Sequence, residues 1–393
     1  MTSGLAQLRD HNRQRVIEAL SRLGVASRSR LAQETGLSRT TISAVVNDLM
    51  AEGSVAEVEL PRSSGPGRPG MGLALARPSG TLIGVDYGHF HVRVAVADLS
   101  YNVLGERYLE LDLDAAPYKA FDTAAEMAGE LLQEVGRPPA SVVAGGVGIP
   151  GPYDRKTGTL HAGAILQSWV GLDVAAELGS RLPYPLFLDN DANLGALGEF
   201  TFGAAADADV MVYIRLSSGI GSSLVLNGYL FRGAGGIAGE LGHVVVKEDG
   251  PMCRCGGRGC LEAFATGRAL RESLKFSHGE LTLARILELS EAGDVGCRRA
   301  LSDAGTTIGR ALGDLCNHLN PDRIVLGGEL SAAGEVLLEP MRIAVRRNAI
   351  PAAAKQVRVA AASLGDRAEV LGALVFAQQQ ADVNLDELPR AFH

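Results

Sequence analysis

The sequence predicts a chain in two parts, in which a small helical N-terminal domain precedes a larger α/β body. Two observations support this division. Apolar residues recur at helical spacing between Asn12 and Glu52, whereas from Thr81 onward short apolar strands alternate with glycine-rich turns and helices. With 393 residues, 46% of them hydrophobic, the chain is long enough to bury more than one core. We therefore expect one domain over residues 1–77 and a second over residues 78–393.

Three short helices are predicted at the N-terminus, over residues 12–22, 28–35 and 38–52. Ser38 is placed to cap the third helix, and the turn before it contains Gly36, which can adopt positive φ. The apolar residues of the third helix lie on one stripe, which leaves small polar side chains on its outer face. This stripe consists of Ile42, Val45, Val46, Leu49 and Met50. The arrangement is typical of a helix-turn-helix.

Strands predicted at residues 55–60 and 73–76 flank a loop that is rich in glycine and proline. The loop contains two arginines and no acidic residue, which fits a wing that lies along phosphates or in a minor groove. A plain linker is the alternative. The outer face of the third helix is polar and cationic rather than apolar, which favours DNA binding over protein interaction. The residues predicted to contact DNA are Arg39, Thr40, Ser43, Asn47, Arg62 and Arg68.

Charge is distributed unevenly along the chain. The formal net charge is −8, but residues 1–77 contain ten arginines and seven acidic residues, an excess of +3, so the remainder carries −11. An anionic partner is therefore expected at the N-terminal end, although so small an excess also fits a solvated surface. The sequence has no apparent secretory signal or membrane-spanning apolar run, which predicts a cytoplasmic protein without a membrane partner.

The body is predicted to be an α/β domain with several short strands. These strands are expected at residues 82–86, 92–98, 142–147, 210–216, 222–226, 323–326 and 357–361. The first two form a hairpin-like opening, and later glycine loops follow at residues 217–221 and 327–328. This order resembles the duplicated ribonuclease-H-like fold of actin and sugar kinases. Each glycine loop could hold phosphate through its backbone N–H groups, but glycine turns after strands are common, so one loop alone is a weak signal.

A polar string at residues 189–193 follows a predicted strand and precedes a predicted helix. Its amide and carboxylate side chains can donate to and accept from sugar hydroxyls, and one carboxylate could act as a general base. Capping of the helix by Asp191 is the simpler alternative. An EF-hand calcium loop is excluded because its required glycine and its twelfth-position glutamate are Leu194 and Phe200.

Three of the five cysteines lie within eight residues. This spacing suits a metal site in a reducing compartment better than a disulfide framework. One histidine and three thiolates form the ligand set of a four-coordinate structural Zn²⁺ site, which leaves no open position for catalysis. The predicted ligands are His243, Cys253, Cys255 and Cys260, with free buried thiols as the alternative. Cys297 and Cys316 lie on apolar helical stretches and are expected in the core.

Glu262 follows the last cysteine of this cluster by two residues. It could be only a negative charge at a helix N-terminus. Contact of Glu262 with a molecule bound in a cleft is favoured, because the metal would hold Glu262 and the turn that contains Glu240 and His243 around that cleft.

These motifs together resemble the ROK family (repressors, open reading frames and kinases), in its regulator branch, over nearly the whole chain. The resemblance is carried by residues 146–152, 189–193, 219–221, 239–243, 326–328 and 334–335, and by the cysteine cluster. It implies an actin-like sugar-kinase fold with two subdomains behind a winged helix-turn-helix, which the family's kinases lack. It also implies that five residues contact a sugar, with Asp191 at the position of the catalytic base and His243 also in the zinc site. These five are Asn190, Asp191, Glu240, His243 and Glu262.

Two departures from the family's kinases bear on catalysis. Those kinases have Asp-x-Gly-Gly-Thr in the first phosphate loop, whereas residues 86–90 here are Asp-Tyr-Gly-His-Phe, so that His89 and Phe90 would obstruct phosphate. Glu329 also brings a carboxylate to a position near the adenosine. The second loop keeps Ser218 and two glycines, but ATP binding is not expected.

The resemblance therefore implies a regulator in which a sugar bound to the kinase-like domain changes operator binding. We expect structural Zn²⁺, no catalytic residue, double-stranded operator DNA as partner, and a homodimer or dimer of dimers on a two-fold symmetric operator. One alternative is an active ATP-dependent sugar kinase with an accessory DNA-binding head. Another is an architectural DNA-binding protein that senses nothing.

Overall fold

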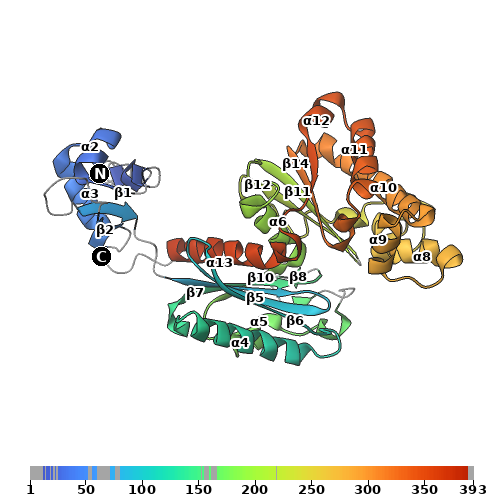
Figure 1. Ribbon diagram of the computed structural model, residues 1–393, viewed down its shortest axis with the longest axis horizontal. Helices are drawn as coiled ribbons and strands as arrows, with labels where there is room; N and C mark the ends of the chain where they lie inside the picture. The colour runs from blue at the N-terminus through green and yellow to red at the C-terminus, as the bar shows by residue number, and fades with distance from the viewer. Residues whose placement is uncertain are drawn as a thin grey trace. The chain divides into compact units, whose positions relative to one another are not determined.

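The computed structural model describes residues 12–13, 15–17, 19–20, 23, 25–51, 55–59, 71–75, 80–151, 153–154, 159–160, 166–217 and 219–387. They form two compact units (Figure 1). The first unit comprises the chain up to Gly80 together with residues 98–102, and the second comprises residues 81–97 and the chain from residue 103 on. Within the described residues, no helix is both long enough and apolar enough to cross a membrane.

Two helices and a tight turn form the centre of the N-terminal unit (Figure 1). Helices α2 (Arg28–Thr35) and α3 (Arg39–Ala51) match the predicted second and third helices. Gly36 between them has a φ of 66°, the left-handed conformation in which many helices end. The side chain of Ser38 accepts a hydrogen bond from the backbone N–H of Thr41 at 3.1 Å, so Ser38 caps α3 as predicted.

A three-stranded antiparallel sheet completes this unit. Its order is β1 (Val25–Ala26), β3 (Met71–Leu75) and β2 (Val55–Glu59). The apolar stripe of α3 is buried against α2 and the described residues of the first predicted helix. The buried side chains include Val16, Leu20, Leu31, Ile42, Val46 and Leu49. The predicted winged helix-turn-helix is confirmed, whereas the loop with Arg62 and Arg68 lies outside the described residues.

The second unit contains two five-stranded sheets with the same strand order. The first sheet has the order β6 (Val103–Glu110), β5 (His91–Asp98), β4 (Thr81–Tyr87), β7 (Val142–Ile149) and β10 (Leu186–Asn190). The second has the order β13 (Tyr229–Leu230), β12 (Ile220–Leu226), β11 (Val210–Leu216), β14 (Arg323–Gly327) and β15 (Arg358–Ala361). In both sheets the last two strands run parallel to the first strand in the sequence. The predicted duplicated fold with two lobes is therefore confirmed.

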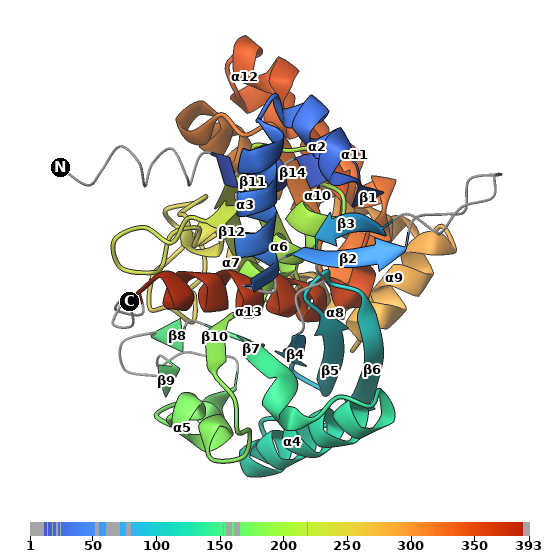
Figure 2. The same cartoon turned by 90° about the vertical axis from the view of Figure 1, so that its left-hand side faces the viewer.

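Helices cover both sheets. On the outer face of the first sheet lie α4 (Pro117–Glu134) and α5 (Val174–Gly179), as Figure 2 shows. Helices α6 (Asp191–Phe202) and α13 (Ala368–Glu387) pack against each other between the sheets, α13 on the first and α6 on the second. Gly372 permits this close packing, because a Cβ atom there would lie 1.7 Å from a backbone carbonyl oxygen of α6.

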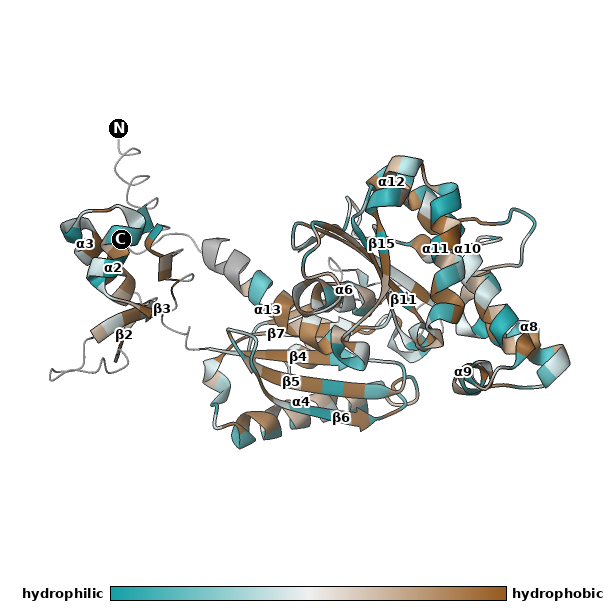
Figure 3. Cartoon of the chain, turned by 45° about the horizontal axis from the view of Figure 1, so that its top comes forward, coloured by the Kyte–Doolittle hydropathy of each residue, from teal (hydrophilic) through white to brown (hydrophobic). Residues whose placement is uncertain are grey.

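Smaller elements surround these layers. The remaining helices are α7 (Glu262–Ala265), α8 (Gly267–His278), α9 (Leu283–Glu291), α10 (Val295–Leu319), α11 (Glu335–Asn348) and α12 (Pro351–Gln356). Short 3-10 helices are η1 (Pro139–Ser141), η2 (Gln167–Trp169), η3 (Leu241–His243), η4 (Glu329–Ala333) and η5 (Gly365–Arg367), and β8 (Tyr153–Asp154) pairs with β9 (Thr159–Leu160). The central strand β4 is predominantly hydrophobic (Figure 3) and all seven of its residues are buried. Each lobe has its own buried apolar core.

Candidate functional site

One cavity in the second unit is lined by all five residues predicted to contact a sugar. These are Asn190, Asp191, Glu240, His243 and Glu262. The first two come from the end of β10 and the start of α6, whereas the other three come from η3, the residue before it, and α7. Both lobes therefore contribute polar side chains to the cavity.

Asn190, rather than Asp191, caps helix α6. Its side-chain oxygen accepts a hydrogen bond from the backbone N–H of Ala192 at 2.9 Å, and its amide donates to the carbonyl oxygen of Gly151 at 2.8 Å. Asp191 is the first residue of α6 and lies in the cavity wall with 9% of its side chain exposed. Burial raises the pKa of the Asp191 carboxyl, and the charge of Arg215 opposes this rise.

Arg215, which the sequence analysis did not single out, holds Asp191 from the side of β11. Its guanidinium lies 3.2 Å from Asp191 Oδ2 and donates through Nε to Glu369 Oε1 at 2.8 Å. Burial raises the pKa of Glu369 to about 7, against the charge of Arg215. One arginine therefore connects β11 to the first turns of α6 and α13. The sequence signal that could have revealed Arg215 is its charge within an otherwise apolar strand.

The four predicted zinc ligands lie together. Their donor atoms are all within 4.8 Å of one another. Cys253 Sγ lies 3.7 Å from His243 Nδ1, and Cys255 Sγ lies 3.7 Å from Cys260 Sγ. These separations are close to the edge of about 3.8 Å that Zn–S bonds of about 2.3 Å give in a tetrahedron. The donor set and its spacing therefore fit Zn²⁺.

The turn that presents the cysteines is tightly folded. Gly259 has a φ of 73°, and a Cβ atom there would lie 1.7 Å from the carbonyl oxygen of Lys247, so only glycine fits. The backbone N–H of Gly257 points to Cys255 Sγ at 3.4 Å. A backbone donor of this kind stabilises a thiolate.

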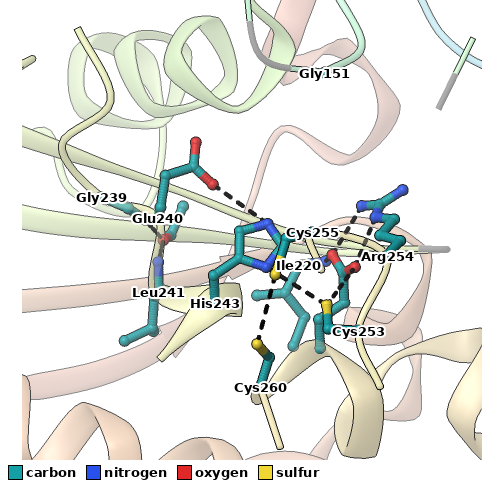
Figure 4. Close-up of polar contacts among 12 residues, drawn as sticks. Gly151, Ile220, Gly239, Glu240, Leu241, His243, Cys253, Arg254, Cys255 and Cys260 are labelled. Atoms are coloured by element: carbon teal, nitrogen blue, oxygen red, sulfur yellow. Dashed lines mark hydrogen bonds and ion pairs between the residues drawn. The ribbon is translucent and has the colours of Figure 1, made fainter. Parts of the chain in front are cut away.

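The ring of His243 lies between the sulfur atoms and Glu240 (Figure 4). Its Nδ1 faces Cys253, whereas its Nε2 lies 3.9 Å from Glu240 Oε2. The two roles predicted for His243 are therefore compatible, because each would use a different ring nitrogen. Burial raises the pKa of Glu240, and the charge of His243 opposes this rise.

Glu262 is almost fully buried, and Arg254 covers it (Figure 4). In the sequence, Arg254 lies between Cys253 and Cys255. Its guanidinium contacts both carboxylate oxygens of Glu262, at 2.7 and 2.8 Å. The backbone N–H of Ile220 also points to Glu262, at 3.3 Å. Arg254 lines the cavity but was not predicted, because its position between two metal ligands drew attention to the cysteines alone.

A second cavity adjoins the first, because Asp191 and Arg215 line both. His89 and Phe90 line it, and Phe90 is 60% exposed. His91 Nε2 lies 2.9 Å from Asp86 Oδ2. Burial would lower the pKa of His91, but the hydrogen bond and charge of Asp86 raise it above its ordinary value. The bulky residues of the degenerate phosphate loop thus face this cavity; Ser218 of the second loop lies outside the described residues.

Helix α3 presents four of the six side chains predicted to contact DNA. Arg39, Thr40 and Asn47 are exposed and Ser43 is half-buried. Arg28 at the start of α2 lies beside them, with its guanidinium 3.4 Å from Asn47 Oδ1. Arg28 adds a cation to this surface that the sequence analysis did not include.

The chain is similar to repressors and to glucokinases of known identity. The model of the ROK family matches residues 82–380, and a winged helix-turn-helix DNA-binding model matches residues 9–55. The chain is 30% identical to a xylose repressor of Bacillus subtilis over 92% of this chain and 93% of that protein.

Two solved structures have the same fold. A ROK family glucokinase from Streptomyces griseus, in complex with glucose and AMPPNP, is 30% identical, with a TM-score of 0.65 over 76% of this chain and 100% of that chain. A ROK family transcriptional regulator described as a homologue of the Escherichia coli MLC protein has a TM-score of 0.74 at 23% identity, over 95% of this chain and 97% of that chain. The family model covers more than half of the chain, and the chain belongs to the ROK family, with a winged helix-turn-helix in front of the family domain.

Proposed function

We propose that this protein is a transcription regulator whose kinase-like unit binds a sugar and thereby changes the affinity of its winged helix-turn-helix for operator DNA. The observation that carries the proposal is the cavity lined by all five residues predicted to contact a sugar, in a chain that also has a DNA-binding fold. The similarity to a xylose repressor over 92% of the chain supports it. D-xylose and D-glucose are therefore the first sugars to test.

The proposed sugar contacts combine acceptors and donors. The carboxylates of Asp191, Glu240 and Glu262 accept hydrogen bonds from hydroxyl groups, whereas Asn190 and His243 Nε2 can donate. Because residues of both lobes line the cavity, a bound sugar would draw the lobes together around α6 and α13. Such closure is the proposed signal to the DNA-binding unit.

The proposed metal is Zn²⁺ held by three cysteine thiolates and His243 Nδ1. When bound, Zn²⁺ would act structurally, because four protein ligands complete its coordination. Coordination through Nδ1 leaves the proton of the neutral imidazole on Nε2, the nitrogen that faces Glu240. His243 would then be a fixed donor toward the sugar.

The second candidate is an active sugar kinase, because Asp191 lies in the cavity and the chain is similar to a glucokinase. One contact favours the regulator: His91 is paired with Asp86 at the first phosphate loop. A coupled ADP-release assay with ATP, Mg²⁺ and a sugar panel is expected to show no turnover above the rate without sugar. Sugar-dependent ADP release would favour the kinase.

The DNA contacts give a further prediction. Arg39→Ala is expected to reduce the ratio between the affinities for operator and scrambled DNA by about 5- to 150-fold. The reason is that a side chain that contacts base edges contributes about 1–3 kcal/mol of discrimination between sequences. Arg68→Ala in the proposed wing should instead weaken binding to all DNA sequences. It should also reduce, by about 0.9, the steepness with which the logarithm of DNA affinity falls with the logarithm of salt concentration. Gel-shift titrations of operator and scrambled DNA at several salt concentrations measure both effects.

Arg285→Ala on α9 is a matched control for these variants. It removes the same charge from an exposed position in the other unit. If Arg39→Ala and Arg68→Ala both bind the operator like this control, the proposed DNA interface is wrong.

A homodimer presenting two such units to a two-fold symmetric operator is part of the proposal, and sedimentation of the free protein tests it.

A further inference from the structure

We propose that the sugar cavity accepts neutral sugars and excludes their phosphate esters, and that the second cavity contributes to this exclusion. The inference rests on the proposed function, since it concerns the ligand class of the same site. It follows from the charges that surround the cavity.

Both arginines that line the sugar cavity are already paired with buried carboxylates. Arg254 makes two contacts with Glu262, at 2.7 and 2.8 Å. Arg215 contacts Asp191 at 3.2 Å and Glu369 at 2.8 Å, so one guanidinium faces two carboxylates. A guanidinium whose charge is matched in this way attracts an additional anion only weakly. Neither arginine therefore forms a phosphate site.

The unmatched charge in the sugar cavity is negative. Glu240 lines it, and its nearest basic group is His243 at 3.9 Å, whose other ring nitrogen faces the cysteine sulfurs. A hydroxyl group can donate to Glu240, whereas a phosphate oxygen cannot. The Glu240 side of the cavity therefore suits a neutral sugar better than an anion.

The second cavity would receive a substituent on any hydroxyl held at Asp191, because Asp191 and Arg215 line both cavities. This cavity adds the carboxylates of Glu110, Asp112 and Glu329. Of its two lining histidines, His89 and His91, the second is already bonded to Asp86. A phosphate in this position would therefore lie among several carboxylates, with few opposing cations among the described lining residues.

The electrostatic consequence is strong discrimination. A phosphate ester carries nearly two negative charges at neutral pH, and like charges in a partly buried site repel one another strongly. We expect the phosphate ester of a sugar to bind at least about tenfold more weakly than the neutral sugar.

Calorimetric titration of the full-length protein tests the inference. The ligands are D-glucose, D-mannose and N-acetyl-D-glucosamine, each compared with its 6-phosphate, and D-xylose, compared with its 1-phosphate, all at constant ionic strength. The expected result is that at least one neutral sugar binds and that its ester binds about tenfold more weakly or worse. An ester that binds as tightly as its neutral sugar, or an ester that binds where no neutral sugar does, overturns the inference and leaves the proposed function standing. Failure of every ligand in both forms overturns both.

The double variant Glu110→Gln/Glu329→Gln tests the role of the second cavity. It is expected to reduce the ratio between the two dissociation constants severalfold by strengthening ester binding, with the affinity for the neutral sugar unchanged. Glu126→Gln, paired with Glu130→Gln, is the matched control, because both residues are exposed on α4, line neither cavity and lower the net negative charge equally. If the double variant keeps the same ratio as this control, the second cavity does not discriminate and that part of the inference is wrong.

Discussion

The Cys260→Ser variant is expected to lose its metal and to unfold at a much lower temperature than the unaltered protein. Cys260 is 2% exposed, lies 3.7 Å from Cys255 and is one of the four residues of the cluster. Structural Zn²⁺ in small domains contributes about 10–16 kcal/mol, and because this cluster organises one loop of a larger body, we expect a loss of several kcal/mol here. Elemental analysis and thermal unfolding, with and without a chelator, measure the two effects.

Cys316→Ser provides the matched control for this variant. Cys316 is also buried, at 1% exposure, but it lies on α10 away from the cluster. The control should keep about one zinc ion per chain and should respond to chelators like the unaltered protein. If both serine variants contain equal zinc, or if protein purified without chelators contains none, the proposed metal site must be abandoned.

Asp191→Asn and Glu262→Gln are each expected to abolish the effect of sugar on operator binding. Each substitution keeps the size of the side chain and removes a carboxylate that lines the cavity. Coupling between two sites is typically about 1–3 kcal/mol, so a sugar should change operator affinity by about 5- to 150-fold in the unaltered protein and hardly at all in the variants. Gel-shift titrations with and without sugar, in the absence of ATP, measure this ratio.

Sugar-free operator binding is the internal control, because both substitutions lie outside the DNA-binding unit and should leave it nearly unchanged. Glu126→Gln on α4 should retain the full sugar response, since this residue does not line the cavity. A full response in both cavity variants would contradict the proposed sugar contacts. A response that requires ATP would contradict the non-enzymatic mechanism.

The layout of the fold could be predicted because local patterns carry it. The apolar stripe of α3, the Ser38 cap and Gly36 identify the helix-turn-helix, and short apolar strands between glycine turns identify the α/β body. Strand β6 was missed because most of its residues are exposed or half-buried, so it lacks the apolar run that marks its neighbours. Its place follows from pairing with β5, which only the folded chain reveals.

The site was predictable where residue types are distinctive and not where distant partners decide a role. Four metal-ligand residues with close spacing identify the cluster without further information. The Arg215–Glu369 contact joins residues 154 positions apart, and no local pattern gives such a separation. Asp191 could be read as a helix cap from the sequence, and only the geometry assigns that cap to Asn190.

The central claim is that the sugar cavity and the DNA-binding unit are coupled, and reciprocal titration tests it most directly. The affinity of the full-length protein for its operator is measured with and without saturating sugar, and its affinity for that sugar is measured with and without saturating operator. Because binding free energies in a closed cycle must balance, we expect the same factor in both experiments, between about 5 and 150. A sugar that binds in the cavity but leaves operator affinity unchanged, with operator likewise leaving sugar affinity unchanged, would contradict the account.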